Sequence, residues 1–311
     1  MQKLKRVLKS TLINLYKDGS IGHSAAMSFY VVLALPVFLL IALSLGGLLW
    51  NTPEVQNQII ASIPRFTGLE DTEIIKQLLD QTLSFNASLG AIYSVILLVL
   101  TSSAIFTYLH QALNEVFGVE VESDDIVRLF LLRRAIAFLM MLFLGLLFIV
   151  NLVAQGIISF GFSYVDQFIY LSGSVLAGLN TAIGLVILFI LFYVIFRVVP
   201  DVKLSWRDAG IGAVVTTFLF ALGKNLIGWY IAQSTLSTAY GAAGSLVVFL
   251  LWVYYSSLIL FFGAEFTESY ALDIGDGIEP KKEASFTLEK HGRHGLFSGI
   301  SKFISDWYEN R

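Results

Sequence analysis

Six stretches of the 311-residue chain are apolar over more than 20 residues each, and this pattern restricts the fold more than any other feature. An α-helix of about 20 apolar residues crosses a bilayer core about 30 Å thick. None of the stretches alternates apolar and polar residues as a strand of an outer-membrane barrel does. We therefore predict an all-α, polytopic membrane bundle of six transmembrane helices. The predicted spans are residues 25–49, 89–109, 135–157, 175–199, 209–232 and 243–265.

The composition agrees with a membrane protein, because 56% of the residues are hydrophobic and only 14% are charged. An average soluble domain has about 25% charged residues, so the composition excludes an ordinary cytosolic enzyme. The chain has no cysteine, which excludes disulfide frameworks, catalytic thiolates, zinc ribbons and iron–sulfur clusters.

The positions of the 20 Lys and Arg residues predict the topology, because cytoplasmic loops of membrane proteins are enriched in these residues. Seventeen of them fall in the N-terminal segment, in the connections after the second and fourth spans, and in the C-terminal tail. Arg65 and Lys76 lie on the opposite side, and Lys224 lies within the fifth span. We therefore expect both termini in the cytoplasm and the six spans in a bacterial plasma (inner) membrane.

Residues 1–24 form a basic segment ahead of the predicted membrane domain, which covers residues 25–265. Apolar residues recur in it at helical spacing, with lysines on the other face. This pattern predicts a short amphipathic helix on the inner leaflet or, alternatively, a solvated helix that leads into the first span. The apolar residues are Leu4, Val7, Leu8, Leu12 and Leu15.

Two other segments outside the spans carry amphipathic patterns. The first outer loop, residues 51–88, contains two apolar stripes separated by a proline and a glycine, which predicts two short helices. The cytoplasmic tail, residues 266–311, is polar over 273–289, and we predict a linker there. Apolar residues at helical spacing over 296–307 predict a short amphipathic helix at its end.

Lys224 is the most unusual residue at membrane depth, about 22–24 Å from the inner start of its span at 1.5 Å per residue. The carboxylates expected near that depth lie in outer loops. A lysine without an acid inside the bundle is suited to an anionic or amphipathic substrate, such as an anionic lipid or a small molecule. Alternatively, its flexible stem reaches the outer interface. The predicted substrate-binding residues are Lys224, Asn225, Asn151, Gln155, Asn180 and Tyr240.

A second polar set lies at the predicted cytoplasmic ends of the spans. Glu265 ends the sixth span, and Arg197 and Arg134 are its expected partners. Ion pairs that break and form at this depth would act as a gate; alternatively, these residues anchor the helix ends at the headgroups. The predicted gate residues are Gln111, Asn114, Arg134, Arg197 and Glu265.

Small residues spaced four apart predict close contact between helices. Gly263-xxx-Thr267 and Gly241-xxx-Ser245 have this spacing, and Thr216-Thr217 lies near the middle of the fifth span.

No motif in the sequence supports catalysis. The chain has no Walker lysine loop, no His–Glu–His spacing of a zinc hydrolase and no Gly-x-Ser-x-Gly elbow. We expect no enzyme activity, no cofactor, no metal and no nucleic-acid partner; the expected partners are membrane lipids, and self-association is left open. The leading hypothesis is a transporter, exporter or lipid translocase, and the alternative is a non-catalytic scaffold that recruits partners.

Several motifs resemble one family of bacterial inner-membrane proteins, the YihY/BrkB family, over about residues 10–270. An early stretch of the chain, Ser24-Ala-Ala-Met-Ser-Phe-Tyr30 followed by Leu35-Pro36, resembles the beginning of the family's sequences. The segment Gln111-Ala-Leu-Asn114 resembles the family's Ala-Leu-Asn signature. The most distinctive motifs are at the end of the shared region. They are Tyr240-Gly-Ala-Ala-Gly-Ser245, Leu251-Trp-Val-Tyr-Tyr255 and Gly263-Ala-Glu265.

The resemblance implies a six-helix fold in the inner membrane with both termini in the cytoplasm, in agreement with the charge distribution. Members of the family are suspected of export or lipid translocation. The family has also carried the label ribonuclease BN, which makes a ribonuclease the third hypothesis; we disfavour it because the sequence offers no nuclease site.

Overall fold

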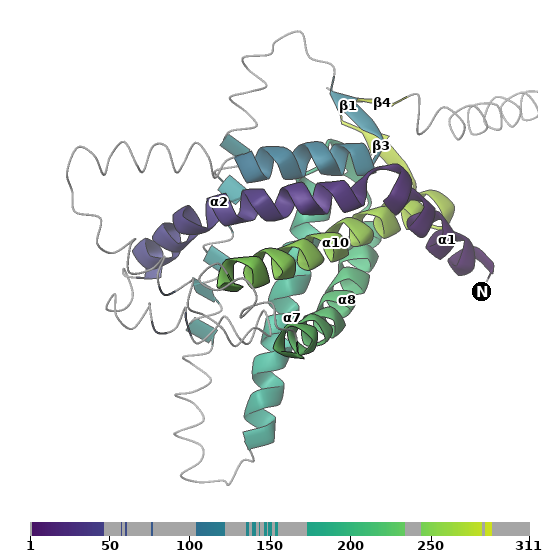
Figure 1. Ribbon diagram of the computed structural model, residues 1–311. Coiled ribbons are helices and arrows are strands. Elements are labelled where there is room, and N and C mark those ends of the chain that lie inside the picture. Colours follow the sequence, from purple (N-terminus) through teal and green to yellow (C-terminus); the bar gives the residue numbers. More distant parts are fainter. Residues whose placement is uncertain are drawn as a thin grey trace, which may run out of the picture.

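Figure 1 shows the computed structural model of the chain, which describes residues 2–46, 104–121, 173–233, 244–281 and 284–287, with separate residues between positions 57 and 154. Most described residues are helical, as expected of an all-α protein. Segments among them that are long and apolar enough to cross a membrane are Thr181–Val198, Trp206–Ile231 and Leu246–Asp273. The total of six spans and the cytoplasmic location of both termini stay predictions.

Four long helices correspond to the first, fourth, fifth and sixth predicted spans. They are α2 (Ser20–Gly46), α7 (Gly173–Val198), α8 (Trp206–Gln233) and α10 (Gly244–Asp273). Their 26 to 30 residues give lengths of about 39–45 Å at 1.5 Å per residue, more than a bilayer core requires. Residues 104–116 are also helical, and so are the described residues between 135 and 154, in the third predicted span.

The sixth predicted span ends at Glu265, but the helix itself, α10, continues for eight more residues to Asp273. The extension is polar, and composition alone placed it in the tail. Its side chains Thr267, Glu268 and Ser269 are nonetheless buried, since other parts of the chain pack around this end of α10.

α10 contacts α8, α2 and α1, and α8 also contacts α7 (Figure 1). α8 and α10 approach each other closely at two glycines. A Cβ on Gly212 would collide with the Thr267 side chain, and a Cβ on Gly263 would collide with Thr216. The predicted close contact at Gly263-xxx-Thr267 is thus confirmed, and its partner is the same Gly-xxx-Thr spacing on α8. Gly241 lies outside the described residues.

Two short antiparallel strand pairs lie at one end of the helices. β1 (Val119–Val121) pairs with β4 (Ala284–Phe286), and β2 (Val202–Leu204) pairs with β3 (Ile278–Pro280). We call this end of the bundle the strand end; it is the end that the charge distribution predicts to be cytoplasmic. The linker predicted over residues 273–289 therefore contains two strands, which is a correction. Polar composition did not reveal them because strand pairing uses backbone groups that every residue carries.

The predicted N-terminal helix is present as α1 (Gln2–Lys17), and a turn at Gly19 with a φ of +67° separates it from α2. α1 crosses the strand end and contacts α10 (Figure 1). The predicted helix over 296–307 lies outside the described residues, as does nearly all of the outer loop over 51–88.

Candidate functional site

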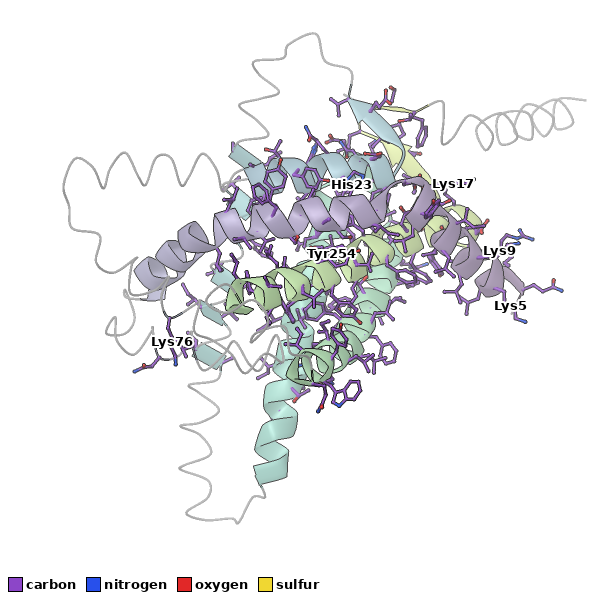
Figure 2. All side chains as sticks on the ribbon, viewed as in Figure 1. Lys5, Lys9, Lys17, His23, Lys76 and Tyr254 are labelled. Atoms are coloured by element: carbon purple, nitrogen blue, oxygen red, sulfur yellow. The ribbon has the colours of Figure 1, made fainter. Side chains whose placement is uncertain are left out.

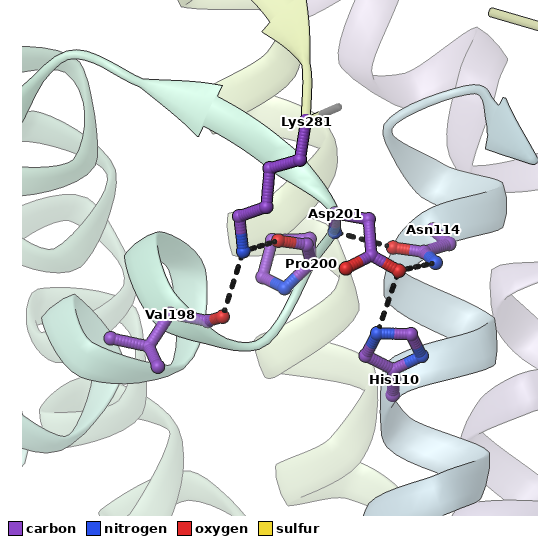
Figure 3. A network of polar contacts seen from close by, with 6 residues as sticks. All are labelled: His110, Asn114, Val198, Pro200, Asp201 and Lys281. Atoms are coloured by element: carbon purple, nitrogen blue, oxygen red, sulfur yellow. Dashed lines mark hydrogen bonds and ion pairs between the residues drawn. The ribbon is translucent and has the colours of Figure 1, made fainter. Parts of the chain in front are cut away.

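Asp201, in the turn between α7 and β2, is the centre of a polar network at the strand end (Figure 3). Its Oδ2 atom lies 2.9 Å from His110 Nε2 and accepts a hydrogen bond from Asn114 Nδ2 at 3.0 Å. The backbone N–H of Asp201 donates to Asn114 Oδ1 at 2.8 Å. His110 and Asn114 are buried on the 104–116 helix, so this network joins that helix to the α7–α8 connection.

Lys281 joins the same network from the segment that follows β3 (Figure 3). Its backbone N–H donates to Asp201 O at 2.9 Å, and its Nζ donates to Pro200 O at 2.7 Å and Val198 O at 3.3 Å. The last carbonyls of a helix have no partner within the helix, and a cation there is favourable. Lys281 therefore closes the C-terminal end of α7.

The network also sets the ionisation of its two charged groups. Burial opposes ionisation of the Asp201 carboxyl, but the hydrogen bonds from His110 and Asn114 and the nearby Lys281 charge outweigh it, so the Asp201 pKa lies below its ordinary value. Burial lowers the pKa of Lys281, and the negative charge of Asp201 offsets part of this effect. Both groups gain from being charged together.

A second group of contacts ties the α1–α2 turn to α10. Ser20 Oγ donates to Glu265 Oε1 at 2.9 Å, and Asn14 Nδ2 donates to Glu268 Oε2 at 3.3 Å. Glu265 is 0% exposed and Glu268 is 1% exposed. Two buried carboxylates one turn apart are costly in a membrane protein unless neighbouring groups solvate them, and the α1–α2 segment supplies these hydrogen bonds.

His23 connects α2 to the 104–116 helix (Figure 2). Its Nδ1 atom lies 2.8 Å from Tyr108 Oη, and its Nε2 atom lies 3.1 Å from Glu115 Oε2. The ring also lies against Phe261 of α10, with centroids 5.8 Å apart. His23 therefore brings three helical segments together at the strand end.

The predicted gate residues do not form a single cluster in the part of the chain that the structure describes. Asn114 belongs to the Asp201 network, and Glu265 is buried beside Ser20. Gln111 and Arg197 are exposed; the Arg197 guanidinium donates to Leu204 O at 3.4 Å and lies 6.0 Å from the Tyr193 ring. Arg197 was one of the two expected partners of Glu265, but the contacts of its guanidinium are with Leu204 and Tyr193. Arg134, the other, lies outside the described residues, so its pairing with Glu265 stays a prediction.

The predicted gate residues do not include four of the residues that interact at the strand end. Lys281 and Glu268 belong to the region that was assigned to a tail, and His110 and Asp201 are 91 residues apart in the chain. One signal was present: Asp201 directly follows a proline at the end of a span, in a connection whose two acids, Asp201 and Asp208, are accompanied by Arg197, Lys203 and Arg207.

Lys224 is half-buried on α8, and Asn225 beside it is exposed and donates to Ala221 O at 3.3 Å. Asn180 lies on α7 at the same depth, since both it and Lys224 are 18 residues, or about 27 Å, from the helix ends that flank β2. The other predicted substrate-binding residues, Asn151, Gln155 and Tyr240, lie outside the described residues.

Comparison with known proteins places the chain in a family. The family described as "Virulence factor BrkB" matches residues 13–286. A UPF0761 membrane protein of Alkalilimnicola ehrlichii is 24% identical over 82% of this chain and 56% of its own length. A UPF0761 membrane protein of Chromobacterium violaceum is 26% identical over 84% of this chain and 60% of its own length. The chain thus spans little more than half the length of these two relatives.

A third relative is similar in length to the present chain. The ribonuclease-like protein YfkH of Bacillus subtilis is 26% identical over 78% of this chain and 87% of its own length. No solved structure matches the chain. The family match covers the buried glutamates of α10, the Asp201 network and both strand pairs, and on that extent the chain belongs to the BrkB family of membrane proteins.

Proposed function

We propose that the protein is a transporter, exporter or lipid translocase of the bacterial inner membrane, and that it moves an anionic or amphipathic substrate. The observation that carries this proposal is the set of buried ionisable groups at the strand end. Ionisable side chains in membrane proteins are costly to bury and usually serve a path for ions or substrates.

The strand-end contacts have the form expected of a gate. The Asp201 network, the Glu265–Ser20 contact and the His23–Glu115 contact each join different segments of the chain through side chains. Contacts of this kind can break without unfolding a helix, because backbone hydrogen bonds within the helices are left intact. We propose that they hold this end closed and separate when substrate passes.

Lys224 supports a binding role for the opposite half of the bundle. Its ammonium group is the cation of α8 that lies far from the strand end, and Asn225 adds an amide beside it. Lys224 also precedes Trp229 by five residues, or about 7.5 Å along the helix. It therefore lies just below the level at which tryptophans mark membrane interfaces, where an anionic headgroup or a carboxylate can reach it.

Reconstitution into lipid vesicles tests the proposal. Flux of a fluorescent anionic phospholipid across the bilayer is measured for wild type, Lys224→Ala and Asp201→Asn. Lys203→Ala is the matched control, because Lys203 is an exposed lysine on β2 outside both polar groups. We expect wild-type flux above that of empty vesicles, a severalfold loss for Lys224→Ala and a normal rate for Lys203→Ala. Equal rates for Lys224→Ala and wild type would remove Lys224 from the site.

If the wild type moves neither phospholipids nor small anions, transport is contradicted and the scaffold alternative is favoured. The observation that supports a scaffold is the exposed basic face of α1. The ribonuclease label of the Bacillus subtilis relative is checked with the same purified protein. RNA degradation that depends on a divalent metal would favour that third function.

A further inference from the structure

The face of α1 that packs against the protein is mostly polar, and Val7 is its one fully buried apolar residue. Val7 and Thr11 are 0% exposed, and Ser10 and Asn14 on the same face are partly buried. Three of the five apolar residues of the predicted stripe are on the outside, since Leu4 is 50%, Leu8 42% and Leu12 61% exposed, whereas Val7 is buried and Leu15 is partly buried. An amphipathic helix of a soluble protein does the reverse and buries its leucines.

The rotation of α1 about its own axis is fixed by its contacts with the rest of the chain. Asn14 donates to the buried Glu268, and Ser20, just beyond the Gly19 turn, donates to the buried Glu265. α1 cannot turn its leucine stripe toward α10 without breaking the hydrogen bond from Asn14 to Glu268. The stripe is therefore held outward.

The depth of α1 follows from its contact with α10. Glu268 is adjacent to Thr267, which meets Gly212 of α8. Six residues closer to the strand end, or about 9 Å, α8 exposes Trp206. Near the opposite end of α8, about 35 Å away, Trp229 is also exposed. Two tryptophans at such a spacing mark the two interfaces of a bilayer. α1 thus attaches at the depth of one interface.

The charge of α1 is suited to an anionic surface. Between residues 2 and 17 the helix has cations and no acid, and all of its cations are exposed. Lys5 and Lys9 extend away from the bundle in Figure 2. The basic residues of α1 are Lys3, Lys5, Arg6, Lys9 and Lys17.

We propose that α1 binds the anionic phospholipids of the inner leaflet, with Leu4, Leu8 and Leu12 among the upper acyl chains and the flanking lysines at the headgroups. Apolar insertion and attraction to anionic lipid act together in helices of this kind. Because the polar face of α1 holds Glu268, lipid binding and the packing of the strand end are linked through one helix. The proposal does not depend on transport.

The absence of cysteine from the chain makes site-specific labelling direct. An environment-sensitive fluorophore is attached at Leu8→Cys or at Ile13→Cys in the full chain, reconstituted in vesicles. Ile13 is the matched control, because it is also apolar and 41% exposed but lies about 140° around the helix from Leu8. Quenching by phospholipids with a spin label on the acyl chain is compared in phosphatidylcholine vesicles with and without phosphatidylglycerol.

We expect severalfold stronger quenching at position 8 than at position 13, and a further increase when phosphatidylglycerol is present. Lys5→Gln combined with Lys9→Gln should abolish that increase, whereas Lys203→Gln on β2 should not. Equal quenching at the two positions would overturn the proposal. A position-8 fluorophore that is shielded from water but not quenched by the lipid would also overturn it, and would assign the stripe to a second copy or a protein partner.

Discussion

Asn114 and Asp201 bind each other twice, through an Nδ2–H···Oδ2 bond of 3.0 Å and an N–H···Oδ1 bond of 2.8 Å. One side-chain amide thus satisfies both a carboxylate and a backbone donor. The pair joins the end of the 104–116 helix to the turn after α7, 87 residues further along the chain. This contact holds two parts of the bundle together at the strand end.

Replacement of Asn114 should therefore destabilise the protein. Asn114→Ala removes both hydrogen bonds and leaves a largely buried carboxylate with fewer donors, at a cost of about 1–3 kcal/mol. Gln111→Ala is the matched control, because Gln111 is exposed on the same helix. The midpoint of thermal unfolding in detergent, followed by tryptophan fluorescence, should fall for Asn114→Ala and stay near wild type for Gln111→Ala. Equal midpoints would show that the pair contributes little.

The lowered pKa of Asp201 predicts a dependence of stability on pH. Because the folded-state pKa lies below the unfolded value of about 3.9, the unfolded chain binds the proton more readily. The stabilisation is complete above the unfolded pKa and is lost as the pH falls through the folded one. Thermal unfolding midpoints measured from pH 7 down to pH 3 should fall more steeply for wild type than for Asp201→Asn. Parallel curves would contradict the assignment.

The crossing of α8 and α10 should not tolerate a methyl group. Gly212→Ala places a Cβ on the Thr267 side chain and should cost about 1–3 kcal/mol through overpacking. Gly210→Ala is the control, since a Cβ there meets nothing within 4 Å and alanine favours a helix by up to about 1 kcal/mol. Chemical denaturation of the two variants should give opposite shifts. Destabilisation by both would point to a general intolerance of α8 instead.

The turn between α1 and α2 should depend on glycine at one position. Gly19 has a φ of +67°, a conformation that costs an alanine about 1 kcal/mol or more. Gly22, on the first turn of α2, has no such φ and open space around its Cα. Limited proteolysis should therefore cut near α1 faster in Gly19→Ala than in wild type, while Gly22→Ala resists it as wild type does. Identical digestion of all three would refute this role.

The sequence predicted the helices well because apolar content over about 20 residues is a local property. The spans assigned to 175–199 and 209–232 agree closely with Gly173–Val198 and Trp206–Gln233. The close contact at Gly263 and Thr267 was also visible, since small residues four apart favour helix contact whatever the partner. What spacing could not indicate is the partner, which is the matching Gly212 and Thr216 on α8.

The tertiary structure alone decided the polar contacts. Asp201, His110 and Lys281 carry no pattern that pairs them, because a hydrogen bond depends on where distant segments meet rather than on local composition. The pairing of β3 with β2 and of β4 with β1 was also not visible in the sequence, because it uses backbone groups. For α1, the sequence showed the leucine stripe but not which face of the helix packs against α10. Hydrophobic spacing determined that α1 is an amphipathic helix; its contacts with α10, including the hydrogen bond from Asn14 to Glu268, determined which of its faces is buried.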